Sequence, residues 1–123
     1  MIIKIDFNSS EAIYMQLRNQ IVVAIASDKL KEGQSLPSVR QMAEILGVNM
    51  HTVNKAYAML REEGYLHLDR RRGAVVAVVS DKDSEMEALY QDMKMLVARG
   101  ICKGISKEVM TWLVHNMYGQ FGL

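Results

Sequence analysis

The chain has 123 residues, of which 50% are hydrophobic and 24% are charged, a composition typical of a folded globular protein. This length fits one ordinary domain, or a small domain with an appendage, and excludes a (β/α)₈ barrel, which needs roughly 250 residues. The 15 basic and 14 acidic residues give a net charge of +1, so the overall charge alone does not indicate a nucleic-acid partner.

Two further features restrict the class of protein. No apolar run approaches the ~20 residues of a membrane span, and the N-terminal segment lacks the basic flank and long apolar stretch of a signal peptide. Cys102 is the only cysteine, which excludes an internal disulfide and a cysteine-cluster zinc site. We therefore expect a cytoplasmic protein with no membrane partner, no metal site and no cofactor.

Three helices are predicted in the first half of the chain. Ser9 and Ser10 are good N-cap residues for the first, with Glu11 in its first turn. The second is predicted from Ser38 to Gly47, and the third from Asn49 to Gly64. Apolar residues recur on one face of each helix, at Ile13, Leu17, Ile21, Ala24 and Ile25, then at Val39, Met42, Ala43 and Leu46, then at Val53, Ala56, Tyr57 and Leu60.

The periodicity changes after the third helix. Residues 65–68 and the β-branched run 74–79 predict two strands joined by a turn at 69–73. The polar stretch from Ser80 to Ser84 is the predicted domain boundary. A fourth helix is then expected to end at Arg99–Gly100, and a fifth to begin after Ser106. Their apolar positions form a seam typical of helix dimerisation, comprising Met86, Leu89, Met93, Leu96, Val109, Leu113 and Met117.

The second and third helices have the features of a helix-turn-helix. Ala43 is small enough for a close helix crossing, Gly47 suits the corner, and Val53 is placed to pack the third helix against the second. The opposite face of the third helix then presents Met50, His51, Asn54 and Lys55, where a recognition helix meets base edges in the major groove. Asn54 can pair with adenine, and Met50 can contact a thymine methyl group.

Basic residues outside the third helix extend this surface. Arg40 can reach phosphate or guanine, although a surface pair with Glu44 is an alternative. Arg70, Arg71 and Arg72 lie at the predicted hairpin tip, where arginines can enter the minor groove or follow the backbone. The predicted DNA-contacting set is Ser38, Arg40, Asn49, Met50, His51, Thr52, Asn54, Lys55, Arg70, Arg71, Arg72 and Gly73.

Several motifs of the chain occur together in one known pattern: Ile13-Tyr14-Met15-Gln16-Leu17, Leu36-Pro37-Ser38-Val39-Arg40, Gly47-Val48-Asn49, Thr52-Val53-Asn54-Lys55-Ala56-Tyr57, Leu60 and Glu63-Gly64-Tyr65-Leu66. With these motifs the chain resembles the GntR family of bacterial winged-helix transcription regulators. The resemblance implies that Arg40 and Thr52 contact DNA and that Gly73 belongs to the wing tip. Many relatives carry arginine where this chain has Met50 and Asn54, which implies a different base specificity.

The short C-terminal part resembles the YtrA-like subfamily, in which two helices dimerise the protein. The expected fold is mainly α-helical with a small β-hairpin: a winged helix-turn-helix, residues 1–79, followed by a two-helix dimerisation segment, residues 80–123. The resemblance implies a homodimeric regulator, most simply a repressor, that binds a palindromic DNA operator. Transporter genes are the implied targets.

Other interpretations remain open at this stage. The winged helix could instead be a protein-interaction module without specific DNA binding. A small-molecule effector could bind near Tyr90, Trp112 and Tyr118, although a dimer core explains the apolar residues there more simply, and regulation by abundance alone needs no effector. Cys102 fits a spectator thiol better than a redox sensor. No nucleophile–base pair, paired carboxylates or glycine-rich phosphate loop indicates an enzyme.

Overall fold

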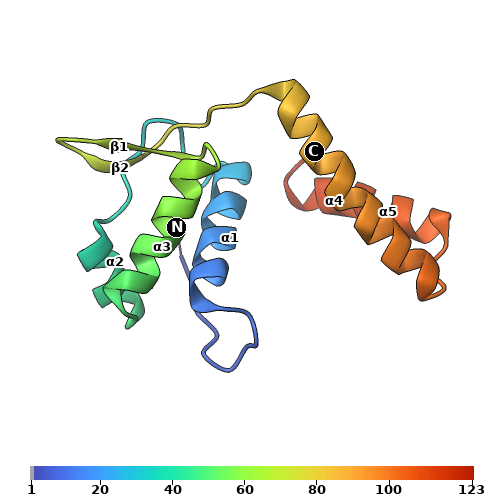
Figure 1. The fold of residues 1–123 in the computed structure, drawn as a ribbon, viewed down its shortest axis with the longest axis horizontal. Helices are drawn as coiled ribbons and strands as arrows, with labels where there is room; N and C mark the ends of the chain where they lie inside the picture. The colour runs from blue at the N-terminus through green and yellow to red at the C-terminus, as the bar shows by residue number, and fades with distance from the viewer. Residues whose placement is uncertain (1) are drawn as a thin grey trace. The chain divides into compact units, whose positions relative to one another are not determined.

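The computed structural model describes residues 2–123, which divide into two compact units, residues 2–79 and residues 80–123. The first unit contains α1 (Ile13–Ala26), α2 (Val39–Leu46), α3 (Met50–Glu62) and a hairpin of β1 (Leu66–Asp69) and β2 (Gly73–Val76) (Figure 1). The second contains α4 (Lys82–Cys102) and α5 (Lys107–Gln120). The predicted class, mainly helical with a small hairpin, is confirmed. None of the helices in residues 2–123 combines the length and apolarity needed to cross a bilayer.

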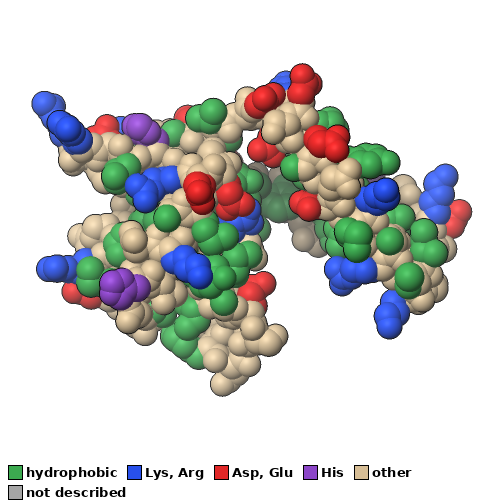
Figure 2. Space-filling model, viewed as in Figure 1, with side chains coloured by type: hydrophobic (Ala, Val, Ile, Leu, Met, Phe, Trp, Pro, Cys, Tyr) green, Lys and Arg blue, Asp and Glu red, His purple; other side chains and the backbone are tan. Residues whose placement is uncertain are grey.

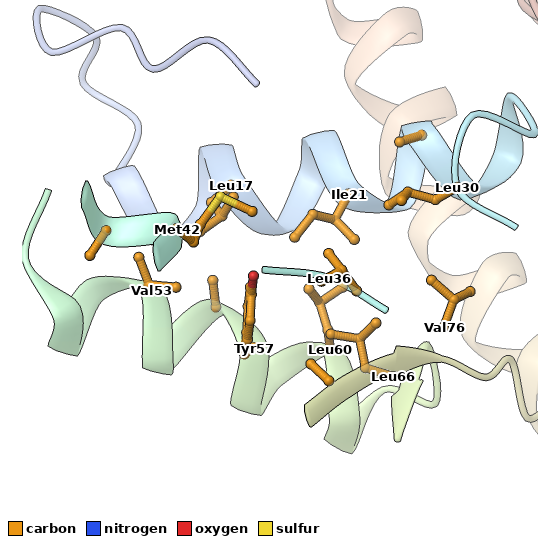
Figure 3. Packing of buried hydrophobic residues seen from close by; sticks show 14 residues of the cluster. Leu17, Ile21, Leu30, Leu36, Met42, Val53, Tyr57, Leu60, Leu66 and Val76 are labelled. Atoms are coloured by element: carbon orange, nitrogen blue, oxygen red, sulfur yellow. The ribbon is translucent and has the colours of Figure 1, made fainter. Parts of the chain in front are cut away.

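The core of the first unit lies between α1, α2 and α3 (Figure 3). Leu17 and Ile21 of α1 and Val53 and Leu60 of α3 are fully shielded from solvent. Leu66 and Val76 attach the hairpin to the same core, which also includes Ala24, Leu30, Leu36, Met42, Ala43, Ala56, Tyr57 and Ala74. The apolar faces predicted for the three helices therefore pack against one another, and the polar face of α3 is left toward solvent.

The start of α1 differs from the prediction. The N-cap residue is Ala12 rather than Ser9 or Ser10, and its side chain makes no cap hydrogen bond. Instead, the buried amide of Gln16 donates to the carbonyl oxygens of Asp6 (3.0 Å) and Glu11 (2.9 Å) and accepts from the Asp6 N–H. Gln16 thus satisfies the backbone of the entering segment, which removes the need for a serine cap.

The corner between α2 and α3 follows the predicted design. Ser38 and Gln41 form a capping box at the start of α2, and Gly47 ends the helix in the left-handed conformation with φ +68°. Asn49 caps α3 by accepting the His51 N–H. Because each end has its own cap, the turn between the helices is set by local chemistry.

The hairpin is antiparallel, with Leu66 opposite Val76 and Asp69 opposite Gly73. The second strand ends at Val76, short of the predicted 74–79, although the N–H groups of Ala77 and Val79 still donate to the carbonyl oxygens of Tyr65 and Gly64. The segment between α1 and α2 lies along the other edge of β2, where the Leu36 N–H donates to the Ala74 carbonyl oxygen (2.8 Å) and Ser35 forms a β-bridge with Val75. This extra pairing supports the wing on both sides.

In the second unit, α4 is longer than predicted at both ends. Asp81 caps the helix, so residues 82–84 of the expected boundary are helical. Gly100 does not end the helix but lies inside its last turn, buried against Ile105 and Met110 of the following segment. A glycine here allows close approach of the two helices. Ser106 caps α5 as predicted, by accepting the Val109 N–H.

Candidate nucleic-acid interface

The exposed face of α3 carries the side chains predicted to contact DNA. Met50, His51, Asn54 and Lys55 are exposed, and Thr52 is half-buried beside them. They occupy the N-terminal half of a helix whose other face is fixed in the core, so the exposed side chains are held in a constant orientation. Donors, acceptors and an apolar group are thus presented together, as a base-reading surface requires.

Two residues of the predicted set use part of their side chain for capping. The Ser38 hydroxyl accepts from the Gln41 N–H (3.1 Å), and the side-chain oxygen Oδ1 of Asn49 accepts from the His51 N–H (2.7 Å). Capping occupies an acceptor in each case, so the Ser38 hydroxyl proton and the Asn49 amide N–H groups remain available as donors to phosphate.

Arg40 lies in the first turn of α2. It lines a shallow surface hollow with Ala43, Glu44, Val48 and Met50. The ion pair that spacing allows between Arg40 and Glu44 is not formed, since the ion pairs among residues 2–123 lie elsewhere. The arginine is therefore placed beside the first residue of α3, where it extends the polar face of that helix.

The wing carries the arginine triplet at its turn, and Figure 2 shows basic side chains in blue at the free end of the hairpin. Asp69 accepts the backbone N–H groups of Arg71 (2.8 Å) and Arg72 (3.0 Å), which fixes the turn and lowers the pKa of the Asp69 carboxyl. The Arg72 guanidinium also donates to the Gly33 carbonyl. Arg72 thus helps to anchor the wing, a role that the sequence pattern did not indicate, while Arg70 and Arg71 extend from the turn.

A contact between α1 and α3 was also missed by sequence reasoning. The Lys55 ammonium lies 3.9 Å from the centre of the Tyr14 ring. The two residues are far apart in the sequence, and no local spacing signals that their side chains meet.

The predicted dimerisation residues lie on the α4–α5 hairpin, where all are exposed except Leu113, which is half-buried. Leu96, Leu113 and Met117 line one apolar groove, whereas Met93 lines a second groove with Val97 and Ile101. The seam residues that line these grooves are thus divided between the two, and Met86, Leu89 and Val109 line neither of them. Of the aromatic residues considered for an effector, Tyr118 lines a small apolar groove that neither Tyr90 nor Trp112 lines.

Within the described part of the chain, no cluster of three or more histidine, cysteine or acidic side chains is arranged to hold a metal ion. The chemistry of the exposed α3 face and the wing is instead that of recognition. A helix-turn-helix whose second helix is exposed, followed by a basic hairpin, defines the first unit as a winged helix-turn-helix DNA-binding domain.

Comparisons with known proteins identify the family. The model of bacterial regulatory proteins of the gntR family matches residues 9–76. The HTH-type transcriptional repressor YtrA of Bacillus subtilis (strain 168) is 33% identical over 109 residues, covering 86% of this chain and 84% of YtrA. The chain belongs to the GntR family and is a transcriptional regulator with a DNA-binding domain. The members of this family are regulators and not enzymes.

Solved structures support the same assignment. YtrA from Sulfolobus acidocaldarius, a GntR-family transcription factor, has a TM-score of 0.63 and 41% identity, and the match covers 76% of this chain and 99% of that one. The DNA-binding domain of AraR in complex with operator ORE1 has a TM-score of 0.52 and 25% identity, with 63% and 94% coverage. The resemblance to YtrA extends beyond the winged helix into the second unit.

Proposed function

We propose that this regulator is a homodimeric repressor that binds a palindromic DNA operator. The observation that carries the proposal is the exposed N-terminal half of α3, where His51 and Asn54 project from a helix anchored in the core. In this proposal α3 enters the major groove, and Arg70 and Arg71 of the wing follow the adjacent backbone or minor groove.

Each polar side chain has a distinct proposed role. Asn54 pairs with adenine through its donor and acceptor, and Met50 contacts a thymine methyl group. His51 donates to phosphate or to a purine acceptor, and Thr52 and Lys55 bind phosphate. Ser38 and Asn49 contact the DNA backbone, and Arg40 reaches phosphate or guanine. The wing residues 70–73 follow the backbone or enter the minor groove.

Dimerisation through the second unit is supported by its exposed apolar surface. In α4, Met86, Leu89 and Leu96 have exposed fractions of 67%, 55% and 50%. Gly100 is the only buried residue within α4 and α5. A two-helix hairpin of this size cannot enclose its own apolar residues, and pairing with a second copy removes them from water.

The proposed dimer determines the symmetry of the operator and the mechanism of repression. A twofold protein favours two inverted half-sites spaced by about 10 base pairs or a multiple of that spacing. Occupancy then blocks the polymerase. The similarity to YtrA, named as a repressor, supports repression, and transporter genes are the targets that YtrA-like regulators suggest. A small-molecule effector acts only if it binds two dimer arrangements with different affinity.

Two substitutions test the DNA-binding face. Asn54→Ala should relax the base preference at one position of each half-site, at a cost of about 1–3 kcal/mol for the preferred base. Arg71→Ala should weaken binding to all sequences. It should also lower the slope of log affinity against log salt concentration by about one, because one fewer counterion is released. Fluorescence anisotropy with selected duplexes measures both effects. Unchanged affinity in both variants would refute the proposed face.

A charge placed on the apolar surface tests the dimer. Leu96→Glu should convert the dimer to a monomer in sedimentation equilibrium, because the carboxylate would have to be buried without a partner. Gln91→Glu, an exposed polar position on the same helix, is the matched control and should leave the dimer intact. A monomeric wild-type protein would contradict the proposal.

A further inference from the structure

The Lys55 side chain has an unusual position for a residue proposed to bind phosphate. It leaves the exposed flank of α3 and places its ammonium 3.9 Å from the centre of the Tyr14 ring on α1. The carboxylates of residues 2–123 form their ion pairs with other cations, so Lys55 faces an aromatic ring instead of an acidic side chain. Its charge is held in place without being neutralised.

The packing of the two helices fixes this geometry. The helices α1 and α3 run side by side, with the apolar core between them (Figures 1 and 3). Tyr14 is half-buried and packs against that core, so its ring is a rigid platform near the start of α1. Lys55 is exposed and lies one turn beyond His51, on the same side of α3.

We infer that Tyr14 is a positioning residue for phosphate binding by Lys55, an inference that rests on the proposed function. A lysine carries an ammonium on a flexible stem of four carbons, and ordering it on a phosphate costs conformational entropy. The ring face attracts the ammonium and limits its positions before DNA arrives. Its N–H groups that point away from the ring stay free to donate to phosphate oxygens.

The inference separates the ring of Tyr14 from its hydroxyl. If the ring positions Lys55, then Tyr14→Phe keeps the platform and should bind DNA like the wild type. Tyr14→Leu removes the π-face and should weaken binding roughly three- to tenfold, the range expected for loss of a cation–π contact. A weakened Tyr14→Phe variant would show that the hydroxyl itself binds DNA, and would overturn the inference.

A double-mutant cycle provides the decisive readout. The variants are Tyr14→Leu, Lys55→Met and the double substitution, and the probe is a fluorescein-labelled duplex of random sequence, about 30 base pairs long, for which phosphate contacts dominate. Lys55→Met should weaken binding and lower the salt slope by about one. The double variant should bind no more weakly than Lys55→Met alone, because the ring acts only through the lysine.

Controls distinguish positioning from a general loss of structure. Tyr65, a second half-buried tyrosine, lies 5.9 Å below the Arg18 guanidinium, and Tyr65→Leu removes a comparable ring without touching Lys55. It should leave DNA affinity unchanged once thermal unfolding shows that the variant is folded. Lys55→Arg, which keeps a cation over the ring, should retain the sensitivity to Tyr14→Leu.

The outcomes also separate this inference from the proposed function. Lys55→Met could weaken binding while Tyr14→Leu has the same effect in the wild-type protein and in the Lys55→Met variant. In that case the positioning role is wrong and the proposed DNA binding stands. If the wild-type protein does not bind the duplex, or Lys55→Met changes nothing, then Lys55 is not a phosphate contact and the inference fails. Absence of all wild-type binding would overturn the proposed function as well.

Discussion

Gly64 should be the least replaceable glycine of the winged helix. Its φ is +83°, and a Cβ built on it would lie 2.7 Å from the Val79 carbonyl oxygen. The same two residues are joined by a hydrogen bond from Val79 N–H to the Gly64 carbonyl oxygen, 2.8 Å long. Gly64→Ala therefore strains the left-handed backbone and forces residue 79 away from residue 64.

The magnitude follows from the two effects. A left-handed conformation costs alanine about 1–2 kcal/mol. Loss of the hydrogen bond adds about 0.5–1.5 kcal/mol, so the total destabilisation is roughly 1.5–3.5 kcal/mol. Gly33 is a matched control because its φ is also +83° and a Cβ there would meet no atom within 4 Å. Gly33→Ala should cost only the backbone strain, about 1–2 kcal/mol.

Urea unfolding followed by amide hydrogen exchange of α3 peptides measures both variants, because those amides report on the first unit. The Gly64→Ala midpoint should fall clearly below that of Gly33→Ala. Equal midpoints would show that the approach of Val79 to Gly64 adds no constraint, and would refute the reasoning.

Three further predictions concern the core and the wing. Leu60→Ala should lower the free energy of unfolding by about 2–5 kcal/mol in urea denaturation, because Leu60 is fully buried, whereas Ile45→Ala at an exposed site should change it by under about 0.5 kcal/mol. Tyr57→Phe should cost about 0.5–1.5 kcal/mol in the same assay, because the Tyr57 hydroxyl donates to a backbone carbonyl at 2.8 Å. The pKa of Asp69 is lowered from 3.8 by hydrogen bonds from the backbone N–H groups of Arg71 and Arg72. Its stabilisation of the wing turn is complete above pH 3.8 and lost as the pH falls through the folded pKa, so the Arg71 amide signal in an NMR titration should move only below pH 3.8.

Local patterns were sufficient to predict most elements of this fold. The spacing of Val39, Met42 and Ala43 places α2, and the caps at Ser38 and Asn49 mark where α2 and α3 begin. These signals work because a helix face repeats every three or four residues and a cap acts on the next turn. The exposed face of α3 could be predicted for the same reason.

Features that depend on distant contacts could not be predicted in this way. Gln16 replaces a serine cap because it reaches back to Asp6, and Gly100 continues its helix because Met110 packs against it. Arg72 reaches the loop after α1, and Lys55 meets Tyr14. Each depends on tertiary packing that brings separate segments together, and tertiary packing overrides local propensity.

The central claim is that the exposed face of α3 reads a palindromic DNA sequence as part of a dimer. Genome-wide capture of DNA bound by the purified protein, with competitor DNA at about 0.15 M salt, tests it most directly. The account predicts one enriched palindrome whose half-sites are spaced by about 10 base pairs or a multiple. Salt-sensitive binding spread evenly over the genome, with no enriched sequence, would contradict it.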